Sequence, residues 1–266
     1  MFKLLMLLLT FHSSLAANVA KDIFILAGQS NMAGRGGVVH GKWDGNVPPE
    51  CRPNPSTLRL SANLTWEEAQ EPLHADIDVG KTCGIGPGMA FVDGLRANGS
   101  RTRVVGLVPC AAGGTKIRKW ARGTRLYRQL VSRAGASVKD GGAIRAILWY
   151  QGESDTVTKE DADAYRGNME TLITNLRSDL NEPSLPVIQV RPFSISLKIL
   201  RHQVRFVFSL TIIGQKDTLL IYEKVMKTAV VGMMAVSGPS NSSGGETNNF
   251  WFRPHLTERL PCLEEQ

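Results

Sequence analysis

Short apolar runs alternate with longer amphipathic stretches along the chain. The runs are rich in β-branched residues and predict buried strands at 22–27, 104–108, 144–150 and 186–190. The stretches between them show helical spacing of apolar residues and predict helices from about Asn31 and at 87–97, 119–134 and 160–181. Strands that alternate with helices in this way are typical of a parallel α/β sheet.

The first apolar run ends in Gly28, Gln29 and Ser30. Ligands of open α/β sheets bind just beyond the carboxyl ends of the strands. The N-terminus of a following helix offers free backbone N–H groups that stabilise a developing oxyanion. Ser30 is therefore a candidate nucleophile. The alternative is that Ser30 only caps the helix and takes no part in chemistry.

The next two runs also end in small or amide-bearing residues. The sequence PCAAGGT follows the strand at 104–108, and QGESD follows the strand at 144–150. Glycines let a backbone N–H approach a ligand closely, and the side-chain amide of Gln151 adds a second donor. Three strand ends of this composition predict an oxyanion site that faces Ser30.

In these segments the chain resembles the plant branch of the SGNH hydrolases, that is, the sialate O-acetylesterase-like domain or carbohydrate esterase family 6. The resemblance spans about residues 20 to 190. The matching motifs occur in the expected order: FILAGQSNMAG at 24–34, GPGM at 86–89, VGLVPCAAGGTK at 105–116 and WYQGESD at 149–155.

The resemblance implies a flavodoxin-like three-layer αβα sandwich, incomplete at its C-terminal end. It implies a serine esterase that removes O-acetyl groups from polysaccharides or sialate-like sugars and needs no cofactor or metal. Ser30 would be the nucleophile. The Ser30 N–H, a backbone N–H around Gly114 and the Gln151 side chain would form the oxyanion hole. Glu153 and Asp155 would support this loop rather than react.

The C-terminal part departs from the family pattern. Family members carry an Asp-x-x-His motif there, which supplies the base and the residue that orients it. In this chain no Asp precedes a His by three positions, and Phe252 stands where the Asp before His255 is expected. We therefore expect an impaired esterase or, alternatively, a catalytically inactive relative that binds glycan. A third alternative is that Glu71 and His74, which have the required spacing but lie in the insert, move over Ser30.

Three regions follow from this pattern: a signal peptide at 1–17, an esterase domain at 18–192 and an atypical tail at 193–266 that we expect to be irregular. The leader has a positive start, a short apolar stretch and a small-residue exit, which are typical of secretion. It is too short to span a membrane, and an uncleaved anchor is the alternative. Within the domain, a Gly/Pro-rich insert at 35–85 is where substrate selectivity commonly resides.

Further features agree with a secreted or cell-wall protein. Glycosylation acceptor sequences begin at Asn63, Asn98 and Asn241. Among the four cysteines, Cys51 and Cys83 bracket the insert and are the first candidates for a disulfide, although other pairings stay open. We expect Cys110 to be a buried thiol. No Cys/His spacing resembles a metal site.

The chain has a formal net charge of +7 and a pI of about 9.4. Lys and Arg are concentrated between residues 116 and 133. A polyanion such as wall pectin would be attracted to such a protein, while a merely solvated basic face is the alternative. The leader and the lack of a recognition motif argue against nucleic acid as a partner. The sequence does not indicate an oligomeric state.

Overall fold

The computed structural model describes residues 20–99, 103–194, 206–213, 224–226 and 228–230, and the leader lies outside these ranges. Its centre is a seven-stranded sheet in the order β5-β4-β6-β1-β7-β8-β9. The inner strands from β4 to β8 are parallel, and the two edge strands are antiparallel to their neighbours. The strands are β1 (Lys21–Gly28), β4 (Thr57–Leu60), β5 (Trp66–Glu68), β6 (Val104–Pro109), β7 (Ala143–Tyr150), β8 (Val187–Ser194) and β9 (Phe206–Ile213).

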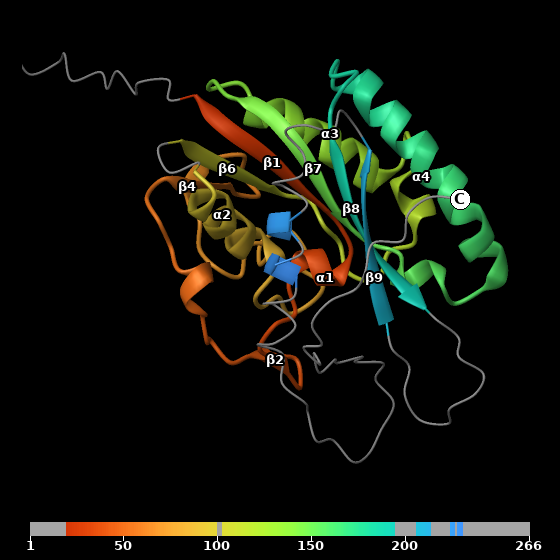
Figure 1. Ribbon diagram of the computed structural model, residues 1–266, viewed down its shortest axis with the longest axis horizontal. Helices are drawn as coiled ribbons and strands as arrows, with labels where there is room; N and C mark the ends of the chain where they lie inside the picture. Colours follow the sequence, from red (N-terminus) through yellow and green to blue (C-terminus); the bar gives the residue numbers. More distant parts are fainter. Residues whose placement is uncertain (1–19, 100–102, 195–205, 214–223, 227, 231–266) are drawn as a thin grey trace, which may run out of the picture.

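Two hydrophobic cores, one on each face of the sheet, make a three-layer sandwich (Figure 1). Along β1, Phe24 and Leu26 enter one core while Ile23 and Ile25 enter the other, because successive side chains of a strand point to opposite faces. The first core lies under α1 (Ser30–Ala33) and α2 (Pro87–Ala97), and the second under α3 (Arg125–Ser137) and α4 (Lys159–Asp179). The α/β fold predicted from the sequence is therefore confirmed.

The helix predicted at 119–134 is wrong in its first turn. A short 3₁₀ helix, η2 (Ile117–Trp120), comes first, and α3 starts only at Arg125. Between them Gly123 has φ +87°, a left-handed conformation that interrupts a helix. The Thr124 side chain then accepts a hydrogen bond from the Tyr127 N–H at 3.4 Å and so caps α3.

The insert at 35–85 contains more structure than its Gly/Pro-rich composition predicts. Its strand β4 joins the central sheet beside β6, and β5 extends the edge. Two shorter strands, β2 (Val38–Val39) and β3 (Lys42–Trp43), form a separate hairpin, and η1 (Pro49–Cys51) follows. The insert is thus an integral part of the sheet as well as a surface feature.

The expectation that the tail at 193–266 is irregular needs correction where the structure describes it. β8 continues to Ser194 and pairs with β9 over eight positions, from Val187↔Ile213 to Ser194↔Phe206. Helical residues 224–226 and 228–230 place Val225, Met226 and Ala229 in the core next to α2. The rest of the tail, with His202, Phe252 and His255, lies outside the described residues.

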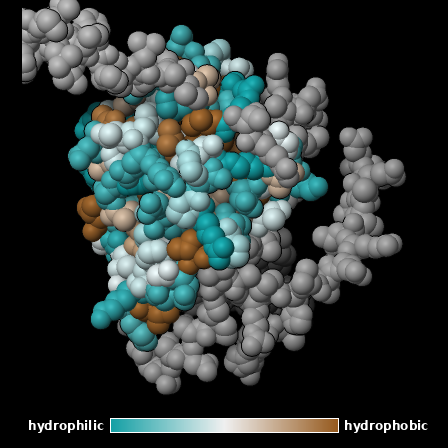
Figure 2. Space-filling model, turned by 90° about the vertical axis from the view of Figure 1, so that its left-hand side faces the viewer, coloured by the Kyte–Doolittle hydropathy of each residue, from teal (hydrophilic) through white to brown (hydrophobic). Residues whose placement is uncertain are grey.

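The disulfide expected between Cys51 and Cys83 is not formed. Both thiols are free and buried, Cys51 in the core against α2 and Cys83 beside the His74 carbonyl. Cys110 is a free buried thiol, as predicted. On the face shown in Figure 2, hydrophobic residues form separate small patches among hydrophilic ones. No helix in the described part of the chain is long and apolar enough to cross a membrane.

Candidate active site

Ser30 lies where the sequence predicts it, at the first position of α1 beyond the carboxyl end of β1. It is partly exposed, and its hydroxyl has no hydrogen-bond partner among the described residues. Gly28 (φ +126°) ends β1 so close to β7 that a Cβ there would collide with the Tyr150 carbonyl. Gln29 N–H donates to the same carbonyl at 2.9 Å. Ser30 is therefore mounted on a tightly fixed strand end.

The loop after β6 is held by a residue of the insert. The Asp78 carboxylate accepts a hydrogen bond from the Gly113 N–H at 3.1 Å and forms an ion pair with Arg35 at 2.5 Å. The next residue, Gly114, is exposed with φ +70°, and its N–H donates to no described residue. Because Asp78 occupies the Gly113 N–H, the Gly114 N–H stays a candidate donor of this loop to an oxyanion.

Gln151 is buried and its amide is already engaged. Its Nε2 lies 2.8 Å from the Thr115 carbonyl, 2.5 Å from Asp155 Oδ2 and 3.2 Å from Gln29 Oε1. An amide nitrogen has two protons, so these three acceptors leave none for an oxyanion. The three-donor hole stays a prediction, and in this structure Gln151 ties the three strand ends together.

Asp155 connects the loops that follow β6 and β7, which agrees with its predicted supporting role. It is 2 % exposed and accepts the Ile117 N–H on both carboxylate oxygens, at 3.0 and 3.1 Å, besides the Gln151 amide. Burial raises the pKa of this carboxyl. It acts through Gln151 and η2 rather than through contact with Ser30.

Replacing Asp155 by Asn should lower the free energy of unfolding by about 2 kcal/mol, because the new amide turns a donor toward donors that need an acceptor. Urea unfolding measures this change. Asp163→Asn is the matched control: Asp163 is exposed on α4 and paired only with Lys159 four residues earlier, so a shift within about 0.5 kcal/mol is expected. Equal shifts in the two variants would contradict the supporting role of Asp155.

Glu153 contacts Asn31, the residue that follows the candidate nucleophile Ser30. Asn31 donates a hydrogen bond to Glu153 Oε1. Burial raises the pKa of Glu153, and burial followed by the Glu153 charge raises that of Tyr150. The Asn31–Glu153 hydrogen bond joins α1 to η3 (Glu153–Asp155) and fixes the helix that begins with Ser30.

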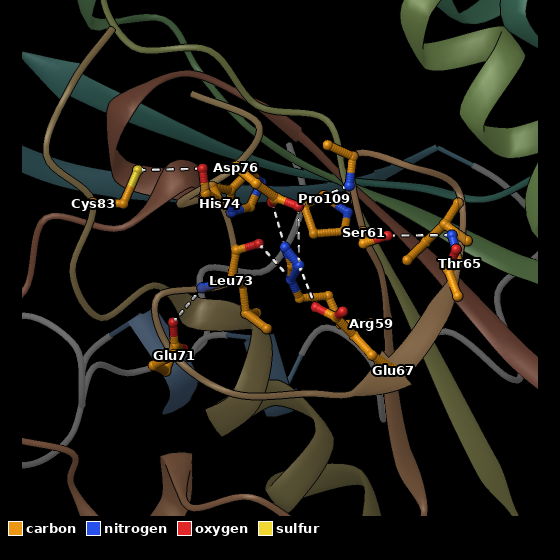
Figure 3. A network of polar contacts seen from close by, with 12 residues as sticks. Arg59, Ser61, Thr65, Glu67, Glu71, Leu73, His74, Asp76, Cys83 and Pro109 are labelled. Carbon is orange, nitrogen blue, oxygen red and sulfur yellow. Dashed lines mark hydrogen bonds and ion pairs between the residues drawn. The ribbon is translucent and has the colours of Figure 1, made fainter. Parts of the chain in front are cut away.

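The Glu71 and His74 pair makes no hydrogen bond to Ser30 in the described structure. His74 is 1 % exposed, the Leu26 backbone is its polar neighbour, and burial lowers its pKa to about 3. Glu71 accepts the Leu73 N–H at 3.0 Å, away from the imidazole (Figure 3). The Arg59 guanidinium next to them is taken by Glu67, Asp76 and the Leu73 carbonyl. Neither side chain hydrogen-bonds Ser30 in the described structure, so the pair does not supply its base in this arrangement.

Glu71 gives the protein a testable pH dependence. Its Oε1 is shielded from solvent, and burial raises its pKa from 4.5 to about 8. Between these values the folded chain keeps a proton that the unfolded chain has lost, so stability falls as the pH rises. His74, with its pKa lowered from 6.5 to about 3, has the opposite effect between pH 3 and 6.5. The two effects cancel from about pH 4.5 to 6.5, and only that of Glu71 remains above pH 6.5.

We therefore expect the free energy of unfolding to fall by about 2 kcal/mol between pH 6.5 and 8. In Glu71→Gln, which keeps the shape and cannot ionise, this fall should be absent. Urea unfolding at the two pH values measures it. An identical fall in Glu71→Gln and in the unmodified chain would show that another group causes it.

The sequence analysis did not identify two positioning residues, Arg35 and Asp78. They lie in the Gly-rich insert, 43 positions apart, and no local sequence pattern indicates their ion pair or the contact with Gly113. The hydrophobic runs, by contrast, mark the three strand ends that meet at the site.

Comparison with known proteins agrees with this geometry. A family model described as carbohydrate esterase, sialic acid-specific acetylesterase, matches residues 20–218 and so includes β9. A probable carbohydrate esterase of Arabidopsis thaliana is 59% identical over 176 residues, which are 64% of this chain and 68% of that protein. The crystal structure of this same Arabidopsis thaliana protein has 57% identity and a TM-score of 0.62, and the match covers 64% of this chain and 73% of that one. The crystal structure of NanS, 18% identical over 61% of this chain and 63% of that one, has a TM-score of 0.50 and shares the fold. The chain therefore belongs to the carbohydrate esterase family of sialic acid-specific acetylesterases.

Proposed function

We propose that this protein is a secreted member of the family whose site receives an O-acetyl group of a polysaccharide or a sialate-like sugar and hydrolyses it slowly. The observation that carries the proposal is the position of Ser30. It stands at the head of α1, and the Gly114 N–H on the neighbouring loop, which donates to no described residue, is a candidate donor to an oxyanion. In the reaction, Ser30 Oγ attacks the acetyl carbonyl, the alcohol of the sugar leaves, and water releases acetate from the acyl-enzyme.

Slow turnover follows from the histidines. The described part of the chain holds two: His74 is buried and neutral, and His40 is exposed in the turn between β2 and β3. Neither hydrogen-bonds Ser30, and no Asp-x-x-His motif occurs anywhere in the sequence. A serine hydroxyl without a base is a weak nucleophile near neutral pH. The same observation favours the second candidate function, an inactive relative that binds acetylated glycan.

Acetate release from an O-acetylated polysaccharide, beside the Ser30→Ala variant, tests this function. The esterase proposal predicts slow release that Ser30→Ala abolishes. Release equal in both proteins would refute a Ser30 esterase. No release, with retained binding to the acetylated but not to the deacetylated polymer, would establish the glycan-binding alternative instead.

Secretion is proposed from the leader pattern at 1–17 and from the glycosylation acceptors. Asn63 and Asn98, the acceptors in the described part, are both exposed and so accessible to glycan transfer. Expression in a secreting plant cell should yield medium protein that begins at Ala17 or Asn18 and loses mass on deglycosylation. Retention of the whole leader on a membrane would support the uncleaved anchor.

A further inference from the structure

A groove of about 540 Å³ is lined by the candidate oxyanion loop, by η2 and by the start of α3. Gly114 and Thr115 are the residues of the loop that line it. The charged residues that line it in the described structure are all cationic, with no carboxylate among the lining residues: Lys116, Arg118, Lys119 and Arg125. The groove is therefore basic, and the loop after β6 forms part of its lining.

Most of this charge is not neutralised by the protein. Lys116 is paired with Asp161 at 2.5 Å, and Arg125 donates to the neutral Gln129 amide at 3.2 Å. Arg118 and Lys119 are exposed, and neither forms an ion pair with a described carboxylate, although the Arg118 charge helps Lys116 to lower the pKa of Asp161. Arg122, on the same segment, is by contrast neutralised by Asp179. Three of the four cations that line the groove, Arg118, Lys119 and Arg125, thus have no ion-pair partner among the described residues.

An anion in this groove would gain attraction that the protein itself leaves unused. Surface cations that only serve solubility are commonly interspersed with acids. Here one short segment, η2 and the start of α3, presents cations toward one hollow beside the residues that would hold an acetyl group. A neutral sugar would gain nothing from them, whereas a carboxylate would form charge-assisted hydrogen bonds with a guanidinium.

We propose that the groove is a subsite for the carboxylates of an acidic polysaccharide, which Arg118, Lys119 and Arg125 bind. This inference rests on the proposed function. The acetylated unit lies at Ser30 and Gly114, and neighbouring uronate units extend along η2. The substrate class is then an O-acetylated polyuronide rather than a neutral glycan. Arg118, Lys119 and Arg125 determine specificity and take no part in the chemical step.

Binding in the full-length Ser30→Ala protein tests the groove independently of hydrolysis. Calorimetry with a galacturonate oligosaccharide should show binding that weakens as salt is added, and a neutral xylo-oligosaccharide of the same length should bind more weakly. Adding Arg118→Gln and Lys119→Gln should weaken galacturonate binding about tenfold, since each exposed ion contact contributes modestly.

The matched control adds Lys139→Gln and Arg166→Gln, two exposed cations outside the groove that remove the same net charge. It should change binding less than about twofold. Equal weakening in the two double variants would show that only net charge attracts the ligand and would overturn the subsite. Absence of galacturonate binding at low salt in a folded protein would overturn it as well. Ser30-dependent acetate release from a neutral acetyl ester, measured separately, reports on the proposed function alone.

Discussion

A chimera in which residues 193–266 are replaced by the corresponding segment of a family member with the Asp-x-x-His motif should hydrolyse a simple acetyl ester about 10⁴- to 10⁶-fold faster than the natural chain. The change supplies a base and its orienting carboxylate and leaves Ser30, Gly114 and the loops around Gln151 untouched. The junction lies within β8, so the incoming segment must continue this strand. Initial rates with p-nitrophenyl acetate measure the gain.

Ser30→Ala in the chimera is the control and should return the rate to background. A folded chimera with the rate of the natural chain would show that the missing motif is not what limits this protein. A natural chain that already approaches the chimera would show that a base is present after all.

Replacement of Arg133 by Met should lower the free energy of unfolding by about 3 kcal/mol or more, the largest stability effect that we expect from a single side chain outside the apolar core. Arg133 lies on α3, is 8 % exposed, and donates to the carbonyls of Pro109 at 2.8 Å, Ser61 at 2.9 Å and Leu60 at 2.6 Å. These carbonyls end β6 and β4, so the variant leaves several buried acceptors without a donor.

Urea unfolding of Arg133→Met and of Arg128→Met, a variant on the same helix, separates this effect from helix propensity. Arg128 is exposed and donates only to the Gly123 carbonyl, so its replacement should cost less than about 1 kcal/mol. Similar losses in the two variants would mean that the contacts of Arg133 with the strand ends contribute little.

Most of the sheet can be predicted from the sequence, because buried parallel strands consist of continuous apolar runs. The helix expected at 87–97 has the same bounds as α2, since Gly86-Pro87 marks its start and Asn98-Gly99 its end. β4 was missed because a four-residue strand with Arg59 in its middle carries no such run. β9 was missed although its sequence, FVFSLTII, is an apolar run, because the Ser- and Arg-containing stretch from Phe193 to Ile213 shows no clean period.

The candidate site shows the same limit. Ser30 and Gln151 could be located because they follow the ends of β1 and β7 closely, and Gly114 because the resemblance places a donor in the loop after β6. The hydrogen bonds of the Gln151 amide to Asp155, Thr115 and Gln29 could not be predicted, because they depend on how loops far apart in sequence meet. The hydrogen bond from the Gly113 N–H to Asp78 could not be predicted for the same reason.

The most direct test of the account is to label the purified, folded chain with a fluorophosphonate probe beside its Ser30→Ala variant. The probe reacts with a serine that a base has activated. We predict no labelling of the folded natural chain and clear labelling of the chimera that carries the Asp-x-x-His motif. Labelling of the natural chain that disappears in Ser30→Ala would show an activated nucleophile and would contradict the missing base.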